Sequence, residues 1–242
     1  MNALILAAGT GSRLVNLTRD LPKALVEVRG RPLLDYTLEF VEALNCEKIT
    51  IVGGFYYDKL VSFVQRCPGN IELLENANFL KGSILTLQKG LANIDQSFLL
   101  LNVDHIYPLR LAKAFLAHKD RFARVTAFVD FDRYLREDDM KILLTEDKRV
   151  KKVSKGLHEF DAGYIGLTYV PRHKLAIYKQ AVQQVATENE HAVVENILQW
   201  LINHDEAPEI FDVSGVRWLE IDNQWDLENA QRILTWMADF LN

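Results

Sequence analysis

A glycine-rich segment followed by a Pro-Lys pair contains the residue types that bind phosphate. Residues 9–14 read GTGSRL, and Lys23 follows Pro22 a short distance further along the chain. Two glycines let the backbone turn tightly, so that several N–H groups can face phosphate oxygens, and Arg13 and Lys23 add two cations. A dinucleotide-binding fingerprint would require glycine in place of Leu14, and no P-loop Gly-Lys-Ser/Thr occurs in the sequence. The plainer alternative is a glycine turn beside two solvated charges.

Two acidic residues follow apolar runs. Asp104 comes directly after 98–103 (FLLLNV), at the C-terminal end of a predicted buried strand, where open α/β sheets place their ligands. A carboxylate there suits Mg²⁺, which takes oxygen ligands and shares its shell with phosphates and water. In 218–222 (WLEID), strand alternation puts Glu220 and Asp222 on one face, as in a strand edge that lines a pocket. Either aspartate could instead be the N-cap of a following helix.

These residues need a scaffold, and the first half of the chain predicts one. Apolar runs and helical periodicity alternate along it. The expected strands are 2–8, 48–52, 70–74 and 97–103, and the expected helices are 33–44, 57–65 and 83–91. Alternating strands and helices predict a parallel sheet with right-handed βαβ connections.

The second half changes character. Short strands are expected at 124–129, 141–144, 150–153 and 164–169, with few helices between them, which favours a mixed-sheet extension beside the first half. The remaining expected elements are a helix that starts at Pro171, a helix over 191–203, a strand over 217–221 and an amphipathic helix over 223–240.

Composition limits the class of protein. The 242 residues are 49% hydrophobic and 25% charged, as in an ordinary globular domain. The net charge of −5 argues against a nucleic-acid surface, which needs clustered basic residues. Cys46 and Cys67 show no disulfide or metal spacing. The sequence offers neither a basic leader nor an apolar run of about 20 residues, so we expect a cytoplasmic protein without a membrane span.

The segments 6–14 (LAAGTGSRL) and 22–25 (PKAL) together resemble the signature of the sugar-phosphate nucleotidyltransferases, the MobA-like and GT-A-like NTP transferases. This signature is Leu-x-Ala-Gly-x-Gly-x-Arg-Leu followed by Pro-Lys. The resemblance implies a three-layer, Rossmann-like α/β fold with a mixed, mostly parallel sheet and helices on both faces. It also implies that Arg13 and Lys23 contact the phosphates as catalytic residues. The loop around the NTP would then consist of Leu6, Ala7, Ala8, Gly9, Thr10, Gly11 and Ser12.

Two further segments match the family. The sequence EIDNQWDL (220–227) fits its Glu-Ile-Asp-x-x-x-Asp-Leu pattern, which implies that Asp222 completes a magnesium site with Asp104. The segment 75–83 (ENANFLKGS) corresponds to the loop that holds the base. The expected nucleotide-binding residues there are Glu75, Asn76, Gly82 and Ser83, although Ser83 could instead cap the next helix.

Within the family, NVDHIY (102–107) and VKKVSKGLHEFDAGYIG (150–166) resemble the CTP:inositol-1-phosphate cytidylyltransferases. By this resemblance Lys155 meets the phosphate of the acceptor, and Asp161 and Gly163 border the acceptor pocket. Ser154 replaces a usual glycine, and Ala162 stands where threonine is common. The alternative for Lys155 is a solvated charge at a strand edge.

The expected activity is transfer of CMP from CTP to a small phosphorylated alcohol or polyol, such as inositol 1-phosphate or phosphocholine, with release of pyrophosphate. One alternative is a sugar-1-phosphate nucleotidyltransferase that uses UTP or dTTP, and another is a non-catalytic nucleotide sensor. We expect a single domain over 1–242, with an NTP-binding half (1–107) and an acceptor-binding half (108–242) that includes the closing metal-site strand. Mg²⁺, the NTP and the acceptor are the expected partners, and homo-oligomerisation stays open.

Overall fold

The computed structural model describes residues 1–14, 17–237 and 240–241. In this part of the chain, nine strands form one sheet in the order β10-β9-β11-β6-β1-β4-β5, while β8 pairs with both β11 and β12. The strands are β1 (Asn2–Ala7), β4 (Lys48–Gly53), β5 (Ile71–Glu75), β6 (Phe98–Asn102), β8 (Thr126–Asp130), β9 (Lys141–Leu144), β10 (Val150–Ser154), β11 (Ala162–Val170) and β12 (Glu209–Asp212).

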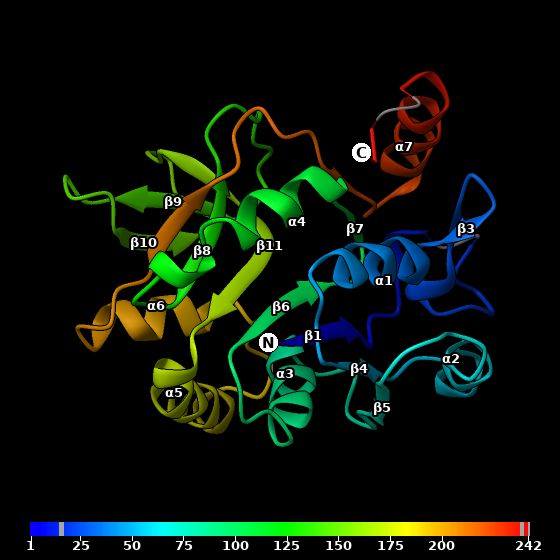
Figure 1. Cartoon of the computed structure of the whole chain (residues 1–242), viewed down its shortest axis with the longest axis horizontal. Helices are drawn as coiled ribbons and strands as arrows, with labels where there is room; N and C mark the ends of the chain where they lie inside the picture. Colours follow the sequence, from blue (N-terminus) through cyan, green and yellow to red (C-terminus); the bar gives the residue numbers. More distant parts are fainter. Residues whose placement is uncertain (15–16, 238–239, 242) are drawn as a thin grey trace.

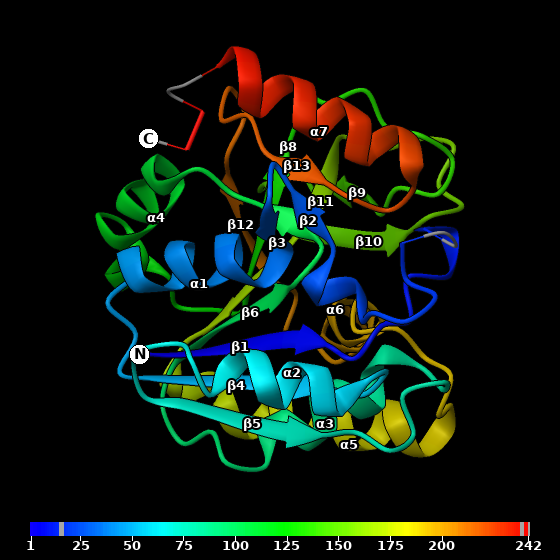
Figure 2. The same ribbon diagram turned by 90° about the vertical axis from the view of Figure 1, so that its right-hand side faces the viewer.

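The parallel part of the sheet consists of β6, β1, β4 and β5. Strand β1 lies between β6 and β4 (Figure 2) and is buried along its whole length. Ala3 and Ile5 belong to one hydrophobic core, whereas Leu4 and Leu6 belong to another. Because each face of β1 is covered, the strand needs apolar residues at every position, which explains its continuous apolar run.

Helices cover both faces of the sheet, so the expected three-layer fold class is confirmed (Figure 1). The helices that share a core with Ile5 are α1 (Leu33–Ala43), α2 (Tyr57–Val64) and α4 (Leu109–Leu116). Those that share a core with Leu4 are α3 (Ser83–Leu91), α5 (Leu175–Glu188) and α6 (Asn196–Asn203). Short 3₁₀ helices occur at Ser12–Leu14, Lys23–Leu25, Lys119–Arg121 and Arg172–Lys174.

A third core joins the C-terminal region to the glycine-rich segment. Helix α7 (Gln224–Trp236) lies at one edge of the molecule, near the C-terminus (Figure 1). Its Leu227 packs in a core with Leu14, Ile106 and Ile221. Next to α7, β13 (Leu219–Glu220) pairs antiparallel with β7 (His105–Ile106), and β2 (Glu27–Val28) pairs with β3 (Arg31–Pro32). The pairing of β13 with β7 brings the segment that contains Asp222 beside Asp104.

The structure differs from the sequence prediction in several elements. Helix α4 and strand β12 were not predicted. The helix expected over 191–203 begins only at Asn196, because the backbone before it pairs with the start of α3. The Gly82 N–H donates to Glu190 O at 2.8 Å, and the Ile84 N–H donates to Ala192 O at 3.2 Å. These bonds use carbonyl groups that a longer helix would need for its own ladder.

The N-terminus of α7 also differs from one alternative that the sequence left open. Asn223 is the N-cap of α7, and its Oδ1 accepts a hydrogen bond from the Asp226 N–H at 3.0 Å. The alternative that Asp222 caps this helix is therefore wrong. Part of the helix predicted over 223–240 falls on residues 238–239, which lie outside the described residues. Among the described residues, every helix is too short or too polar to cross a membrane.

Candidate active site

Lys23 lies at the centre of a cluster of opposite charges. It begins the 3₁₀ helix after Pro22, and only 8% of its surface is exposed. Its Nζ lies 2.7 Å from Asp104 Oδ2 and 2.6 Å from Asp222 Oδ1. Gly11 lies against the Lys23 side chain with a φ of +64°, where a Cβ would meet Lys23 Cβ at 3.2 Å. The structure thus brings together the glycine-rich turn, the lysine and both predicted aspartates.

The two carboxylates set the charge state of Lys23, and Lys23 acts on them in turn. Burial by itself would lower the pKa of Lys23, but the neighbouring Asp104 and Asp222 carboxylates raise it above its ordinary value. Burial would raise the pKa of Asp104, whereas Lys23 and His105 lower it far below its usual range. The ammonium and this carboxylate are therefore charged at neutral pH.

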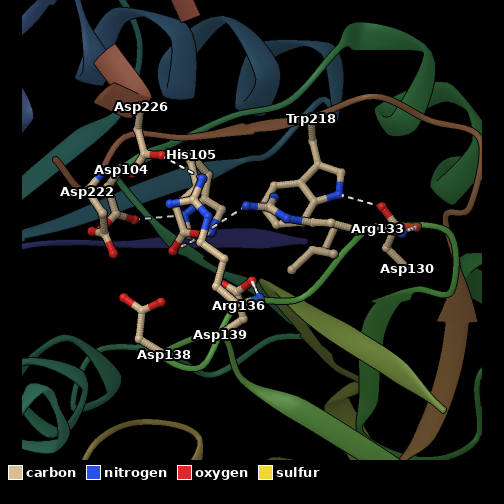
Figure 3. A network of polar contacts seen from close by, with 12 residues as sticks. Asp104, His105, Asp130, Arg133, Arg136, Asp138, Asp139, Trp218, Asp222 and Asp226 are labelled. Carbon is tan, nitrogen blue, oxygen red and sulfur yellow. Dashed lines mark hydrogen bonds and ion pairs between the residues drawn. The ribbon is translucent and has the colours of Figure 1, made fainter. Parts of the chain in front are cut away.

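Arg13 reaches the same carboxylate from the glycine-rich segment. Its NH2 forms an ion pair with Asp222 Oδ2 at 2.8 Å, and its NH1 donates to Asp138 Oδ2 at 3.0 Å. About half of the Arg13 side chain, 54%, is exposed. Asp138 and Asp222 lie on the same side of the site (Figure 3), and Arg13 links them. Both predicted catalytic cations thus meet at Asp222.

The donor set fits a magnesium ion. Asp104 and Asp222 each present a carboxylate oxygen to the same ammonium group, so the two carboxylates lie close together. Within the described residues, His, Cys, Asp and Glu form no group of three or more that could hold a metal. Mg²⁺ is commonly held by one or two carboxylates, while substrate phosphates and water complete its shell. Two aspartates beside the glycine-rich turn match this requirement.

The predicted base-binding residues hold the shape of their loop. Asn76 is buried, its Nδ2 donates to Thr86 Oγ1 at 3.0 Å, and its Oδ1 accepts from the Asn78 N–H at 2.9 Å. Ser83 Oγ accepts from the Val194 N–H at 3.1 Å, so Ser83 does not cap α3. At Gly82 a Cβ would overlap the carbonyl of residue 192. Glu75 is exposed at the end of β5.

Of the three predicted acceptor-binding residues, Lys155 lines a cavity beside the charge cluster. This cavity of about 70 Å³ is also lined by His105 and Asp222. Asp161 and Gly163 are not among its lining residues. The exposed Asp161 carboxylate accepts from the Leu144 N–H at 2.7 Å and so joins β11 to β9, and Gly163 lies in β11 where it pairs with both β8 and β9.

His105 is a residue of the site that the sequence analysis interpreted as a loop residue held by backbone hydrogen bonds rather than as a catalytic base. Its Nδ1 lies 2.7 Å from Asp104 Oδ1, and its ring stacks with Tyr107 and Trp218, each at 5.5 Å between centroids. Its Nε2 lies 3.7 Å from Glu220 Oε1. Burial would lower the pKa of His105, but the Asp104 carboxylate raises it above its ordinary value. His105 thereby fixes the orientation of Asp104.

The segment between β8 and β9 contributes arginine and aspartate side chains to the same site (Figure 3). The Arg133 guanidinium lies 3.8 Å from the centre of the Trp218 ring, and Trp218 Nε1 donates to Asp130 Oδ2 at 2.9 Å. Arg136 NH2 lies 2.9 Å from Asp226 Oδ1, and Asp226 Oδ2 accepts from the Asp222 N–H at 3.2 Å. The alternation in 218–222 placed Glu220 on the site face, but no sequence signal marked the two arginines.

Comparison with known proteins identifies a family. The model of the family described as "MobA-like NTP transferase domain" matches residues 3–181. The "Bifunctional IPC transferase and DIPP synthase" of Aquifex aeolicus (strain VF5) is 26% identical over 233 residues, which cover 96% of this chain and 51% of that protein. The "CTP:phosphoglutamine cytidylyltransferase" of Campylobacter jejuni is 27% identical over 249 residues, which cover 94% of this chain and 98% of that protein.

The chain thus spans about half of the first relative and nearly all of the second. A solved structure, that of the inositol-1-phosphate CTP transferase from T. maritima, has a TM-score of 0.83 to this chain at 21% identity. The match covers 99% of this chain and 95% of the other. At this identity the match supports the fold, which is the α/β fold of nucleotidyltransferases.

Proposed function

The chain belongs to the MobA-like NTP transferase domain family and is a nucleotidyltransferase, and from this premise we propose that it transfers CMP from CTP to a small phosphorylated alcohol, polyol or amine. Pyrophosphate is the second product. The observation that carries the proposal is the meeting of Lys23, Asp104 and Asp222 beside the glycine-rich turn. A phosphate-binding turn, a buried cation and two carboxylates are the groups that nucleotidyl transfer requires.

In the proposed reaction, a phosphate oxygen of the acceptor attacks the α-phosphorus of the NTP. The new P–O bond forms as the bond between the α-phosphorus and the bridging oxygen breaks, and the electron pair leaves with pyrophosphate. The acceptor phosphate is already ionised at neutral pH, so the reaction needs no general base. Its barrier falls through alignment and charge neutralisation.

The residues of the site have matching roles. Lys23 stays protonated between its carboxylates and would neutralise charge that grows at the α-phosphate. Arg13 is half-exposed and would turn from Asp138 toward the phosphates of the NTP. Asp104 and Asp222 would hold Mg²⁺, which when bound reduces the repulsion between the two anionic substrates. His105 keeps Asp104 oriented.

Support for CTP and for a small acceptor comes from the relatives and the cavity. One relative is named as a CTP-dependent cytidylyltransferase, and its length nearly equals that of this chain. The cavity beside Asp222 is small, about 70 Å³, and is lined by charged groups of both signs. The charges of both signs suit an acceptor that carries a phosphate and a second polar group, although the cavity is smaller than the roughly 300–1,000 Å³ of ordinary ligand pockets. Lys155 would meet this phosphate.

A substrate matrix tests the proposal. Pyrophosphate release is measured with Mg²⁺ for CTP, UTP, GTP, ATP and dTTP, each against inositol 1-phosphate, phosphocholine, glycerol 3-phosphate and glucose 1-phosphate. We expect turnover with CTP and at least one of the first three acceptors. Turnover of UTP or dTTP with glucose 1-phosphate, and none with CTP, would instead favour a nucleotide-sugar synthase. Binding of an NTP without release of pyrophosphate from any pair would favour a sensor.

A further inference from the structure

The cavity beside Asp222, where we place the acceptor, contains a carboxylate that the proposed mechanism does not use. Glu195 immediately precedes α6 and lines the cavity together with Lys155, Tyr164 and Asp222. Gly166 also lines the cavity, and a Cβ at this position would lie 2.9 Å from the His105 ring. Glu195 and members of the charge cluster therefore line the same cavity.

Most charged side chains around this cavity are engaged. Asp138 and Asp222 pair with Arg13, and Asp222 also pairs with Lys23. Arg133 NH2 lies 3.4 Å from Glu220 Oε2. Two further charged groups also have partners. His105 pairs with Asp104, and the Asp139 carboxylate accepts from the Arg136 N–H (Figure 3). Most charged side chains that line the cavity thus already have partners within the protein.

Glu195 and Lys155 are the exceptions. Among the described residues, no side-chain hydrogen bond within 3.5 Å or ion pair within 4.0 Å joins either group to another residue. No fully buried side-chain oxygen or nitrogen of these residues lacks a hydrogen-bond partner. The Glu195 carboxylate accepts a hydrogen bond only from its own backbone N–H among these residues. An anionic and a cationic side chain, neither of them joined to another side chain, therefore line the same cavity.

Lys155 and Glu195 are together complementary to a ligand with two different polar groups. Lys155 matches a phosphate, and Glu195 matches a group that donates hydrogen bonds or carries positive charge. Burial raises the pKa of Glu195 above its ordinary value, while a hydrogen bond from its own backbone N–H and the charge of Lys155 act in the opposite direction. A carboxylate kept in such surroundings without a side-chain partner gains more from a ligand than one already paired with another side chain.

Given the proposed function, we propose that Glu195 selects the acceptor by binding its hydroxyl or ammonium group, while Lys155 binds its phosphate. The chemistry shared by these acceptors is a phosphate joined by a short linker to a hydroxyl-bearing or cationic group. Glu195 is then a specificity-determining residue, and the reaction centre at Asp104 and Lys23 does not depend on it.

Isothermal titration calorimetry tests this inference without requiring turnover. The probes are inositol 1-phosphate, phosphocholine, phosphoethanolamine and glycerol 3-phosphate, each titrated into the wild type, Glu195→Gln and Glu195→Ala. We expect at least one probe to bind the wild type and to bind Glu195→Ala about ten- to hundredfold more weakly, as for loss of a hydrogen bond to a charged group. CTP should bind all three proteins within about twofold, because Glu195 lies outside the NTP loop.

The glutamine variant distinguishes the two kinds of acceptor. Its amide keeps a carbonyl acceptor, so a hydroxyl-bearing probe should lose less affinity with glutamine than with alanine. A cationic probe should lose as much with either, because both variants remove the negative charge. Glu188→Gln, an exposed position at the end of α5, is the matched control and should bind every probe as the wild type does.

Three results would overturn the inference: unchanged probe affinity in both Glu195 variants, an equal loss of CTP affinity in them, or no binding of any probe by the wild type. Selective weakening of a probe in these variants, together with no pyrophosphate release from wild type, would support the inference and count against the proposed reaction. The binding role and the reaction can therefore fail separately.

Discussion

At the scale of single residues, Lys23 is the point at which distant parts of the chain meet. Its partners Asp104 and Asp222 lie 81 and 199 residues further along the sequence. All three were predicted from motif and strand position, and Arg13 joins them. His105 was interpreted as a loop residue held by the backbone, because nothing in the sequence reveals its aromatic stack. That stack with Trp218 exists only after β13 pairs with β7.

Lys23→Ala should lower kcat strongly. Lys23 is a preorganised cation held by two carboxylates, and loss of one such electrostatic group costs about 2–4 kcal/mol of barrier. Steady-state kinetics of pyrophosphate release measure this cost. Lys89→Ala, on the surface of α3, is the control and should behave as wild type. A Lys23 variant within about threefold of wild type would mean that the Pro-Lys pair only forms a turn.

Asp104→Asn and Asp222→Asn should each reduce kcat by at least about a hundredfold at saturating Mg²⁺ while the thermal transition stays cooperative. Each change removes a negative charge from the proposed metal site and a partner from Lys23. Asp120→Asn, whose side chain is 89% exposed, is the matched control. Normal rates in either site variant would exclude a two-carboxylate metal centre.

At the scale of elements, the short β13–β7 pair positions the second aspartate. The Ile221 N–H donates to Asp104 O at 2.9 Å, and Ile221 anchors the strand in the core under α7. Strand alternation predicted which side chains of 218–222 face the site, because period two is a local property. The sequence could not predict which strand would be its partner. The true start of α6 was missed for a similar reason, since it depends on contacts with the distant Gly82 turn.

Asp226→Asn should raise the Mg²⁺ concentration needed for half-maximal activity by about tenfold or more, with a smaller effect on kcat at saturating Mg²⁺. Asp226 acts as a positioning residue, because its carboxylate holds both the Asp222 N–H and Arg136. Partners of this kind commonly change metal affinity by about 10–100-fold. Magnesium titrations of activity measure the shift. Glu228→Gln on the same helix serves as control, and an equal magnesium requirement in wild type and Asp226→Asn would contradict the positioning role.

At the scale of the whole molecule, the two sequence halves share their cores. One core contains Leu4 and Leu87 from the first half together with Val129, Tyr178 and Leu198 from the second. Strand β11 of the second half also pairs with β6 of the first. The alternation of strands and helices predicted the parallel half, whereas the branch of the sheet at β8 could not be predicted, since it depends on the pairing of β12 with a strand far away in the sequence.

We therefore propose that 1–107 and 108–242 are functional halves of one cooperative domain. Calorimetric unfolding should give one transition whose van't Hoff enthalpy equals its calorimetric enthalpy. A saturating NTP with Mg²⁺ should move this transition as a whole to higher temperature, because the ligand binds the folded state. Two resolved transitions, of which the NTP shifts only one, would show that the halves unfold separately.

Transfer of label from CTP tests the central claim most directly. The enzyme is incubated with Mg²⁺, the acceptor found in the substrate matrix, and CTP labelled with ³²P at either the α- or the γ-phosphorus. If the acceptor phosphate attacks the α-phosphorus, the α label appears in the acceptor product and the γ label appears only in pyrophosphate. Appearance of the γ label in the acceptor, or release of labelled inorganic phosphate without any α label in the acceptor, would contradict nucleotidyl transfer at this site.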